Sequence, residues 1–240
     1  ARQLNAVRMQ PGQMARGGGQ FFRGILKTGV LGRSLYQLYQ ITSITAEATA
    51  VQAWLHVYAL AFSLYFTLSG FSDIAQGLGA LFGLRLPRNF YYPYQSRDMG
   101  DFFDRFHITI SGFFRWAMGE RAGQPHQRPL RRQTFLAGLL LGLWFGIRLN
   151  YLLWGAYLAL FVIFERDLYA RAWEKIPVLF RRLLTLCIVL AGFTVFGEAS
   201  LAATAQLVGT MFSFNRFYSD NDLYLLTSHW LLLIISALFA

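Results

Sequence analysis

Histidine is the first residue type to examine for proton chemistry, because its ordinary pKa lies near neutral pH. His107 follows Asp104 and Arg105 in a segment rich in aromatic residues. If this segment is helical, Asp104 and His107 lie at positions i and i+3, and the carboxylate can fix the imidazole tautomer. We therefore predict that His107 is a candidate general base, with Asp104 and Arg105 as its neighbours in the site.

The other three histidines are weaker candidates. His56 and His229 lie in apolar runs next to Trp54 and Trp230, and an ionisable residue in a membrane segment is a functional hint. A neutral histidine that is hydrogen-bonded to a neighbour is the simpler interpretation for both. His126 lies between glutamine, arginine and proline residues, and we expect it to be solvated.

The sequence does not indicate a metal or cofactor site. The single cysteine, Cys187, cannot form an internal disulfide or a cysteine-based zinc site, and we expect it to be inert. A second cluster of metal ligands is missing, as are a G-x-S-x-G sequence and a Walker loop. We therefore expect neither a metal nor a bound cofactor.

The composition is that of a membrane protein. Of the 240 residues, 55% are hydrophobic and only 14% are charged, against about 25% charged in average globular domains. This hydrophobicity also excludes a disordered chain. The net charge of +10 does not favour nucleic-acid binding, because the basic residues flank apolar runs and do not form one soluble face. The expected first partner is the lipid bilayer.

The N-terminal residues are basic and amphipathic. Residues 1–33 carry six basic residues and no acidic residue, and 21–41 has an apolar face opposite a basic face. We expect 1–50 to form a basic amphipathic segment in the membrane interface, with a solvated tail as the alternative. Gly17-Gly18-Gly19 is expected to break a helix in its middle.

The next segment, 51–84, is long enough to cross a bilayer. Its first part, 51–72, contains no charged residue and would span roughly 33 Å as a helix. Asp73 interrupts the apolar run, and Gly79 and Gly83 place small residues on one face for close helix packing. We predict a membrane helix or a helix pair.

The rest of the chain divides into two parts. Residues 85–132 combine nine arginines with many aromatic residues, which suits re-entrant or interfacial helices buried in protein. Residues 133–240 contain charge-free runs of 15 or 16 residues, short for a span, and are predicted to form C-terminal membrane helices in a thinned bilayer. The basic segments 1–33 and 85–132 belong on the cytoplasmic side. An odd number of crossings would separate them, which favours a pair or a broken span within 51–84.

Three ordered stretches carry a resemblance to a known family. Residues 65–79 read YFTLSGFSDIAQGLG, 85–94 read RLPRNFYYPY, and 96–111 read SRDMGDFFDRFHITIS. They resemble the "YFDFSGYSD", "NF–PY–S" and "FW–RWHIS" motifs of the membrane-bound O-acyltransferase family. The most similar branch is that of alginate O-acetylation and teichoic-acid D-alanylation proteins of bacteria.

The resemblance implies a fold, a reaction and a location. The fold is all-α and polytopic, a ring of short transmembrane and re-entrant helices around a thinned membrane centre. Family members move an acetyl or D-alanyl group from a cytoplasmic thioester donor to an acceptor outside. An active chain would thus use an acyl thioester donor together with an acyl carrier or polysaccharide machinery. The implied location is the bacterial inner membrane, and we expect the chain to be a fragment of a longer polypeptide.

The sequence departs from the family where the resemblance implies the catalytic base. The family histidine stands in a "GLWHG" motif, which reads GLWFG here, so that Phe145 occupies its position. The "LYH" element reads Ala156-Tyr157-Leu158, Thr67 replaces an aspartate, and Phe106 replaces a tryptophan. His107 is retained from the "RWHIS" motif.

Two functions are compatible with this pattern. In the first, the fold persists without acyl transfer, and the protein is a scaffold or subunit of a larger membrane complex. In the second, the protein is an active O-acyltransferase for a cell-envelope polysaccharide, with His107 as general base. Phenylalanine cannot accept a proton, and general-base catalysis contributes about 10²–10⁴-fold to rates, which favours the first. An active enzyme needs a polar channel to His107, whereas a scaffold would pack Phe145 among apolar neighbours.

Overall fold

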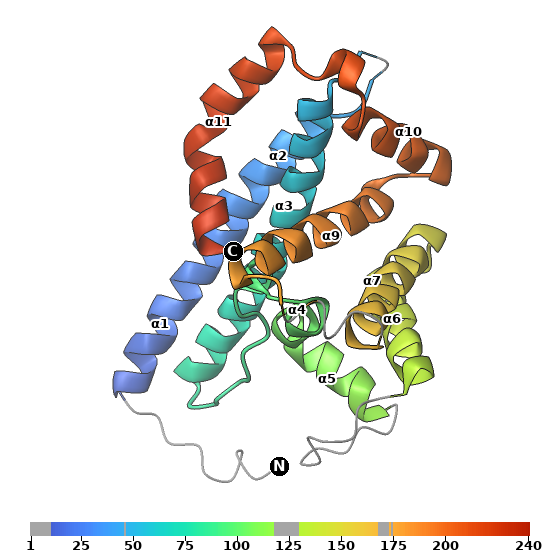
Figure 1. The fold of residues 1–240 in the computed structure, drawn as a ribbon. Coiled ribbons are helices and arrows are strands. Elements are labelled where there is room, and N and C mark those ends of the chain that lie inside the picture. The colour runs from blue at the N-terminus through green and yellow to red at the C-terminus, as the bar shows by residue number, and fades with distance from the viewer. Residues whose placement is uncertain (1–10, 46, 118–129, 168–172, 174) are drawn as a thin grey trace.

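The computed structural model describes residues 11–45, 47–117, 130–167, 173 and 175–240. Within these ranges the chain forms helices and loops and no strand, which confirms the predicted all-α class. Figure 1 shows the helices grouped around the long helix α3, with the α6–α7 hairpin on the far side from α1. The helices are α1 (Pro11–Leu26), α2 (Arg33–Ile41), α3 (Ala50–Leu81), α4 (Met99–Arg105), α5 (Ile108–Ala117), α6 (Arg131–Phe145), α7 (Leu149–Asp167), α9 (Val178–Gly197), α10 (Leu201–Met211) and α11 (Asp220–Phe239).

Short 3₁₀ and π segments complete the described secondary structure. A π-helical turn, Lys27–Gly32, joins α1 to α2, and 3₁₀ turns occur at Pro93–Gln95 and Phe214–Arg216. Among the described residues, α3, α9 and α11 are long and apolar enough to cross a membrane. The protein is therefore an integral membrane protein by length and composition, as predicted.

Side-chain caps determine where several helices begin. Thr49 accepts a hydrogen bond from the Gln52 amide at the start of α3, and Ser200 accepts one from Ala203 at the start of α10. At the start of α11, the Asp222 carboxylate accepts hydrogen bonds from the Ser219 amide and hydroxyl, and a third from the Thr49 hydroxyl at 2.8 Å. These bonds satisfy amides that a helix leaves unpaired at its N-terminus. The Thr49–Asp222 bond also ties α11 to α3.

Glycines join the N-terminal helices to α3. Figure 1 shows α1 and α2 running along α3 in the opposite direction. A Cβ atom on Gly24 would lie 2.6 Å from the Gly70 carbonyl oxygen, and one on Gly77 would lie 2.6 Å from the Phe21 amide nitrogen. Gly32 likewise faces Thr67. The two backbones therefore approach closely because these positions lack side chains.

This arrangement corrects three sequence predictions. Gly17-Gly18-Gly19 does not break the helix, because Gly17 packs on Gly77 and Ala80 and the packing offsets the weak helix propensity of glycine. Residues 50–81 form one continuous helix, and not a pair or a broken span. The close-packing glycines are not the pair Gly79 and Gly83, since Gly83 lies outside α3 with φ 76°.

The N-terminal helices lie alongside a candidate membrane span. Helices α1 and α2 and the π-helical turn between them pack on α3 through close glycine contacts. Among the described helices, α3, α9 and α11 are the candidate spans, and α1 and α2 are not among them. The interfacial placement of 1–50 stays a prediction.

A polar contact between the same helices neutralises the charge that interrupts the apolar run of α3. Lys27 Nζ lies 2.7 Å from Asp73 Oδ2, and Gln20 donates a hydrogen bond of 2.7 Å to Gln76. Both members of the ion pair are partly buried. Asp73 is thus tolerated in α3 because a cation from the π-helical turn faces it.

A second pair of helices packs through glycine. A Cβ atom on Gly138 of α6 would lie 2.5 Å from the carbonyl oxygen of Gly155 on α7. Gly142 lies against the backbone of Tyr151. α6 and α7 therefore form a tight hairpin, and the sequence that resembles the catalytic motif of the family forms the end of α6 up to the turn.

Candidate functional site

His107 lies in the break between α4 and α5. α4 ends at Arg105, and His107 adopts a left-handed backbone conformation with φ 55°. The helical spacing that was predicted between Asp104 and His107 is therefore wrong, because the helix ends between them. A positive φ is unusual for a residue with a side chain, and such positions often occur at functional sites.

The His107 imidazole is buried between aromatic rings. Its ring centroid lies 5.3 Å from that of Phe90 and 6.3 Å from that of Trp144, and the residue is 8% exposed. Its Nδ1 atom is buried with no hydrogen-bond partner among the described residues. The predicted bond from a carboxylate to this atom is therefore not formed. Burial lowers the pKa of His107, so the neutral form that a general base requires is the stable one.

The two predicted neighbours of His107 have other contacts. Arg105 Nε lies 2.6 Å from Asp101 Oδ1, and the Arg105 guanidinium stacks 5.5 Å from the centre of the Tyr91 ring. Asp104 is exposed and lines a cavity between α4, α5, α6 and α7. Arg105 thus anchors the loop before α4, and its charge is balanced by Asp101.

Phe145 is packed in an aromatic cluster. Its ring meets the rings of Trp154 and Phe196 edge to face, at centroid distances of 5.5 and 5.2 Å. Trp154 is fully buried. The preceding residue, Trp144, faces His107 instead. The structure therefore brings the two motif segments together through Trp144 and His107, while Phe145, which is half-buried, packs against the aromatic core.

Gly146 ends α6 and allows this orientation. Its φ of 142° lies in a region that side chains rarely adopt, so the turn to α7 depends on glycine. The GLWFG sequence thus keeps the glycine that the turn requires, although Phe145 replaces the histidine of the family motif.

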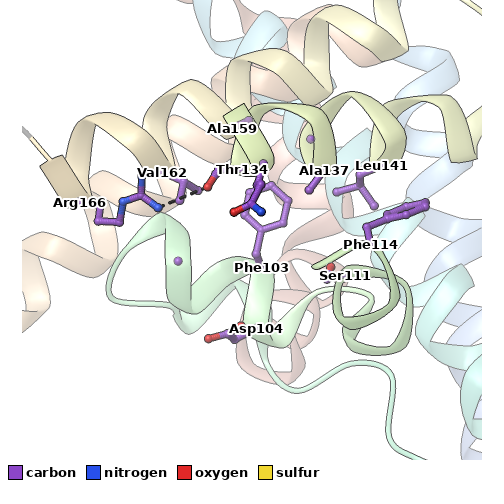
Figure 2. Close-up of a pocket in the computed structure, with 13 residues that line it drawn as sticks. Phe103, Asp104, Ser111, Phe114, Thr134, Ala137, Leu141, Ala159, Val162 and Arg166 are labelled. Carbon is purple, nitrogen blue, oxygen red and sulfur yellow. Dashed lines mark hydrogen bonds between the residues drawn. The ribbon is translucent and has the colours of Figure 1, made fainter. Parts of the chain in front are cut away.

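Figure 2 shows the cavity beside this site, with Phe103 and Phe114 projecting from the short helices towards α6 and α7. Its volume is about 210 Å³. Its walls are mainly apolar, and polar groups occur where the helices meet it, including Ser111, Thr134 and Arg166. Arg166 donates a hydrogen bond of 3.3 Å to the Thr134 hydroxyl.

This cavity could hold a short apolar group, such as an acyl chain, next to polar groups that orient it. Ser111 connects it to the histidine, because the Ser111 amide donates a hydrogen bond of 3.0 Å to the His107 carbonyl oxygen. The imidazole of His107 and the ring of Phe145 are not among the residues that line it. The backbone of the candidate base is therefore close to the cavity, while its imidazole is not part of the wall.

Sequence reasoning missed a buried carboxyl group at the end of α7. Glu165 Oε2 accepts a hydrogen bond of 2.6 Å from the Met99 amide at the start of α4, while Oε1 is buried without a partner among the described residues. Burial raises the pKa of Glu165 to about 7. The signal was weak, because Glu165 stands in a run of charged residues that reads as a helix end.

We expect stability to fall as the pH rises from about 4.5 to about 7. In this range the folded chain keeps a proton on Glu165 that the unfolded chain has lost, and linkage lowers the free energy of unfolding by about 2 kcal/mol. Glu165→Gln should remove this loss and leave the variant about 2 kcal/mol more stable above pH 7. Unfolding of both proteins in micelles at pH 4.5 and 8 measures the difference. Identical pH profiles would contradict the prediction.

The remaining histidines are hydrogen-bonded in the way the simpler interpretation predicted. His56 Nδ1 lies 3.1 Å from the Tyr39 carbonyl oxygen, and His229 Nδ1 lies 3.0 Å from the Leu225 carbonyl oxygen. His126 lies outside the described residues. The described residues contain no group of three or more histidine, cysteine or acidic side chains that could hold a metal ion.

Fold and site together define a polytopic helical membrane protein with a buried histidine beside an apolar cavity. No family model matches the chain. It is 32% identical over 209 residues to "Probable alginate O-acetylase AlgI" of Pseudomonas aeruginosa. The aligned segment covers 85% of this chain and 40% of that protein. Over the segment that it spans, the chain is therefore homologous to members of the membrane-bound O-acyltransferase family.

Two further relatives carry different names. The chain is 36% identical over 107 residues to "Peptidoglycan O-acetyltransferase" of Helicobacter pylori, covering 44% of this chain and 20% of the relative. It is 25% identical over 149 residues to "Teichoic acid D-alanyltransferase" of Bacillus subtilis, covering 58% and 38%. The chain spans about 40% of the length of the alginate O-acetylases that it matches.

Proposed function

We propose that this chain has an acyltransferase fold whose family site is silent, and that it serves as a scaffold or subunit in a membrane complex of the cell envelope. One observation carries the proposal: Phe145 fills the position of the motif histidine and packs between Trp154 and Phe196. A phenyl ring cannot take a proton, and the rings that surround Phe145 are aromatic side chains that do not act as bases. A reacting hydroxyl group would find no base at this position.

The distribution of charge supports an orientation in the bacterial inner membrane. Contacts between Arg181 and Asp98, and between Arg131 and Asp167, place the starts of α9 and α6 at the same end of the bundle as α4 and the end of α7. Several basic side chains lie at this end, among them Arg97, Arg105, Arg166 and Arg181. By the positive-inside rule it faces the cytoplasm, and the end that carries Glu198 faces outward.

One observation favours the alternative, an active O-acyltransferase with His107 as base. The His107 Nδ1 atom is buried without a described partner, and a cavity of acyl-chain size lies next to the same backbone. An acceptor hydroxyl could supply the missing hydrogen bond. In that case an acyl carrier would deliver a thioester donor, and a cell-envelope polysaccharide would receive the acyl group.

A deletion and a point variant separate these two functions. The full-length gene is deleted, and envelope acylation is measured after return of either the parent or the His107→Ala form. If the protein is a scaffold, deletion lowers acylation and both forms restore it equally. If His107 is the base, the His107→Ala form should lose about 10²–10⁴-fold in transfer of a labelled acetyl thioester, which would overturn the proposal.

A further inference from the structure

A polar pocket lies between α1 and the C-terminal end of α3. Its volume is about 340 Å³, and its lining comes from α1, from α3 and from the loop that follows α3. The α1 side chains are Gln13, Arg16 and Gln20, which stand at the three- and four-residue spacing of one helix face. Gln76 of α3 and Arg85 of the loop complete the polar lining of this hollow, the α1–α3 pocket.

The two helices that form the pocket are held together by close contacts. A Cβ atom on Gly17 would lie 2.9 Å from the Gly77 carbonyl oxygen, so the two backbones touch. Gln20 donates a hydrogen bond of 2.7 Å to Gln76, whose own amide donates one of 3.0 Å to the Ser72 hydroxyl. The walls of the pocket are therefore fixed by contacts within the protein.

The described lining of the pocket carries two positive charges and no carboxylate. Arg16 donates a hydrogen bond of 3.1 Å to a carbonyl oxygen one turn earlier in its own helix, and neither Arg16 nor Arg85 forms an ion pair with a described acidic residue. Asp73 lies 3.5 Å from Gln20, but its charge is balanced by Lys27 at 2.7 Å. An anion in the pocket would supply the counter-ion that the two guanidinium groups lack.

Gln13 adds an unsatisfied hydrogen-bond donor to the same wall. Its Nε2 atom is buried and has no hydrogen-bond partner among the described residues. A buried donor without an acceptor is costly, so groups of this kind usually have a partner. An anionic oxygen in the pocket would be an acceptor for this amide as well as for the guanidinium groups. Together these are donors of the kind that bind phosphate.

The position of the pocket along α3 places it at the level of lipid headgroups. The charge-free stretch 51–72 of α3 spans roughly 33 Å, enough for the hydrocarbon core of a bilayer. Gln76 lies one turn beyond this stretch, and Arg85 follows the end of the helix. Leu86, which lines the pocket, and Phe82 are 46% and 61% exposed. A lipid would find polar donors for its headgroup and apolar surface for its tails.

We propose that the α1–α3 pocket binds the phosphate of an anionic phospholipid, with Arg16 and Arg85 as the charged groups and Gln13 as a neutral donor. Basic pockets between helices are headgroup sites in membrane proteins. The positive lining disfavours zwitterionic lipids, because it repels the cationic part of their headgroups. The volume lies within the range of small-molecule sites. Binding here is independent of the proposed function, since it uses no residue near His107 or Phe145.

Two lipids and one free anion test this inference. The full-length protein in nonionic micelles is titrated with dioleoylphosphatidylglycerol, dioleoylphosphatidylcholine or inorganic phosphate, and bound lipid is counted by native mass spectrometry. We expect saturable binding of phosphatidylglycerol, at least about tenfold tighter than that of phosphatidylcholine, and no displacement by equimolar inorganic phosphate. Equal affinity for the two lipids would overturn the inference. Displacement by inorganic phosphate would identify a site for free anions and would overturn the lipid assignment.

Two arginines of α1 provide a matched pair of variants. Arg16 lines the pocket, whereas Arg23, two turns later, is exposed and does not line it. Arg16→Gln should weaken phosphatidylglycerol binding about tenfold or more, the equivalent of one hydrogen bond to a charged group. Arg23→Gln removes the same charge and should leave the affinity unchanged. Equal effects of the two variants would show that net charge, and not the pocket, attracts the lipid, and would overturn the inference.

Gln13→Leu separates hydrogen bonding in the pocket from its charge. The variant keeps both arginines and removes the unpaired amide. Phosphatidylglycerol binding should weaken about tenfold, because the phosphate loses one donor. Without anionic lipid the variant should unfold at the same temperature as the parent or a higher one, since no buried donor is left unpaired. Unchanged affinity of the folded variant would overturn the placement of the phosphate beside Gln13.

Discussion

Gly24→Leu is expected to separate α1 from α3 and to destabilise the protein by about 3 kcal/mol or more. The Cβ atom alone would lie 2.6 Å from the Gly70 carbonyl oxygen and 2.7 Å from the Ile74 amide nitrogen. Both are backbone atoms of α3, so no flexible side chain can move to make room. The helices would have to part, and the nearby Lys27–Asp73 ion pair would lose its geometry.

Gly18→Leu in the same helix is the matched control. No atom lies within 4 Å of a Cβ built on Gly18, and leucine has the higher helix propensity. This variant should be as stable as the parent or slightly more so. Thermal unfolding of the three proteins in micelles measures the difference. Equal stability of both variants would show that α1 does not pack on α3 through its glycines.

Phe145→His should destabilise the protein by about 3 kcal/mol without creating an active site. The imidazole would replace a ring that meets Trp154 and Phe196 edge to face, and neither ring accepts a conventional hydrogen bond from it. Burial there disfavours a charged imidazole. The apolar change Phe145→Leu keeps most of the volume and should cost only about 1 kcal/mol.

The comparison of these two variants tests the proposed silent site directly. Unfolding gives the stability of each variant, and transfer from a labelled acetyl thioester gives its activity. We expect Phe145→His to be the less stable of the two and to remain inactive. A stable Phe145→His variant that transfers acetyl groups would show that the channel is open and that the parent lacks only its base.

Local patterns were sufficient to predict much of the architecture. The all-α class, the membrane environment and the presence of a membrane-spanning segment within 51–84 follow from composition and charge-free runs, because burial of backbone groups in lipid requires helices. The family resemblance followed from ordered motifs over 65–111. The sequence also showed that Phe145 replaces a family histidine, a difference that is visible residue by residue.

The association of distant segments could not be predicted in this way. Gly17-Gly18-Gly19 resembles a helix break until Gly17 is seen against Gly77, since packing energy outweighs local propensity. The pairing of Asp104 with His107 assumed a helix that in fact ends at Arg105. Glu165 appeared to be part of a charged helix end, and only its contact with Met99 revealed a buried carboxyl group.

The sequence by itself thus determined the class of the protein, its helices and the identity of the residue at the family's catalytic position. The tertiary structure alone decided that Phe145 turns into an aromatic cluster, that His107 lies between Phe90 and Trp144, and that His56 meets Glu198. The physical reason is the separation along the chain of the residues that interact. Helix formation and membrane insertion depend on neighbouring residues, whereas each of these sites joins side chains from helices that are far apart in the chain.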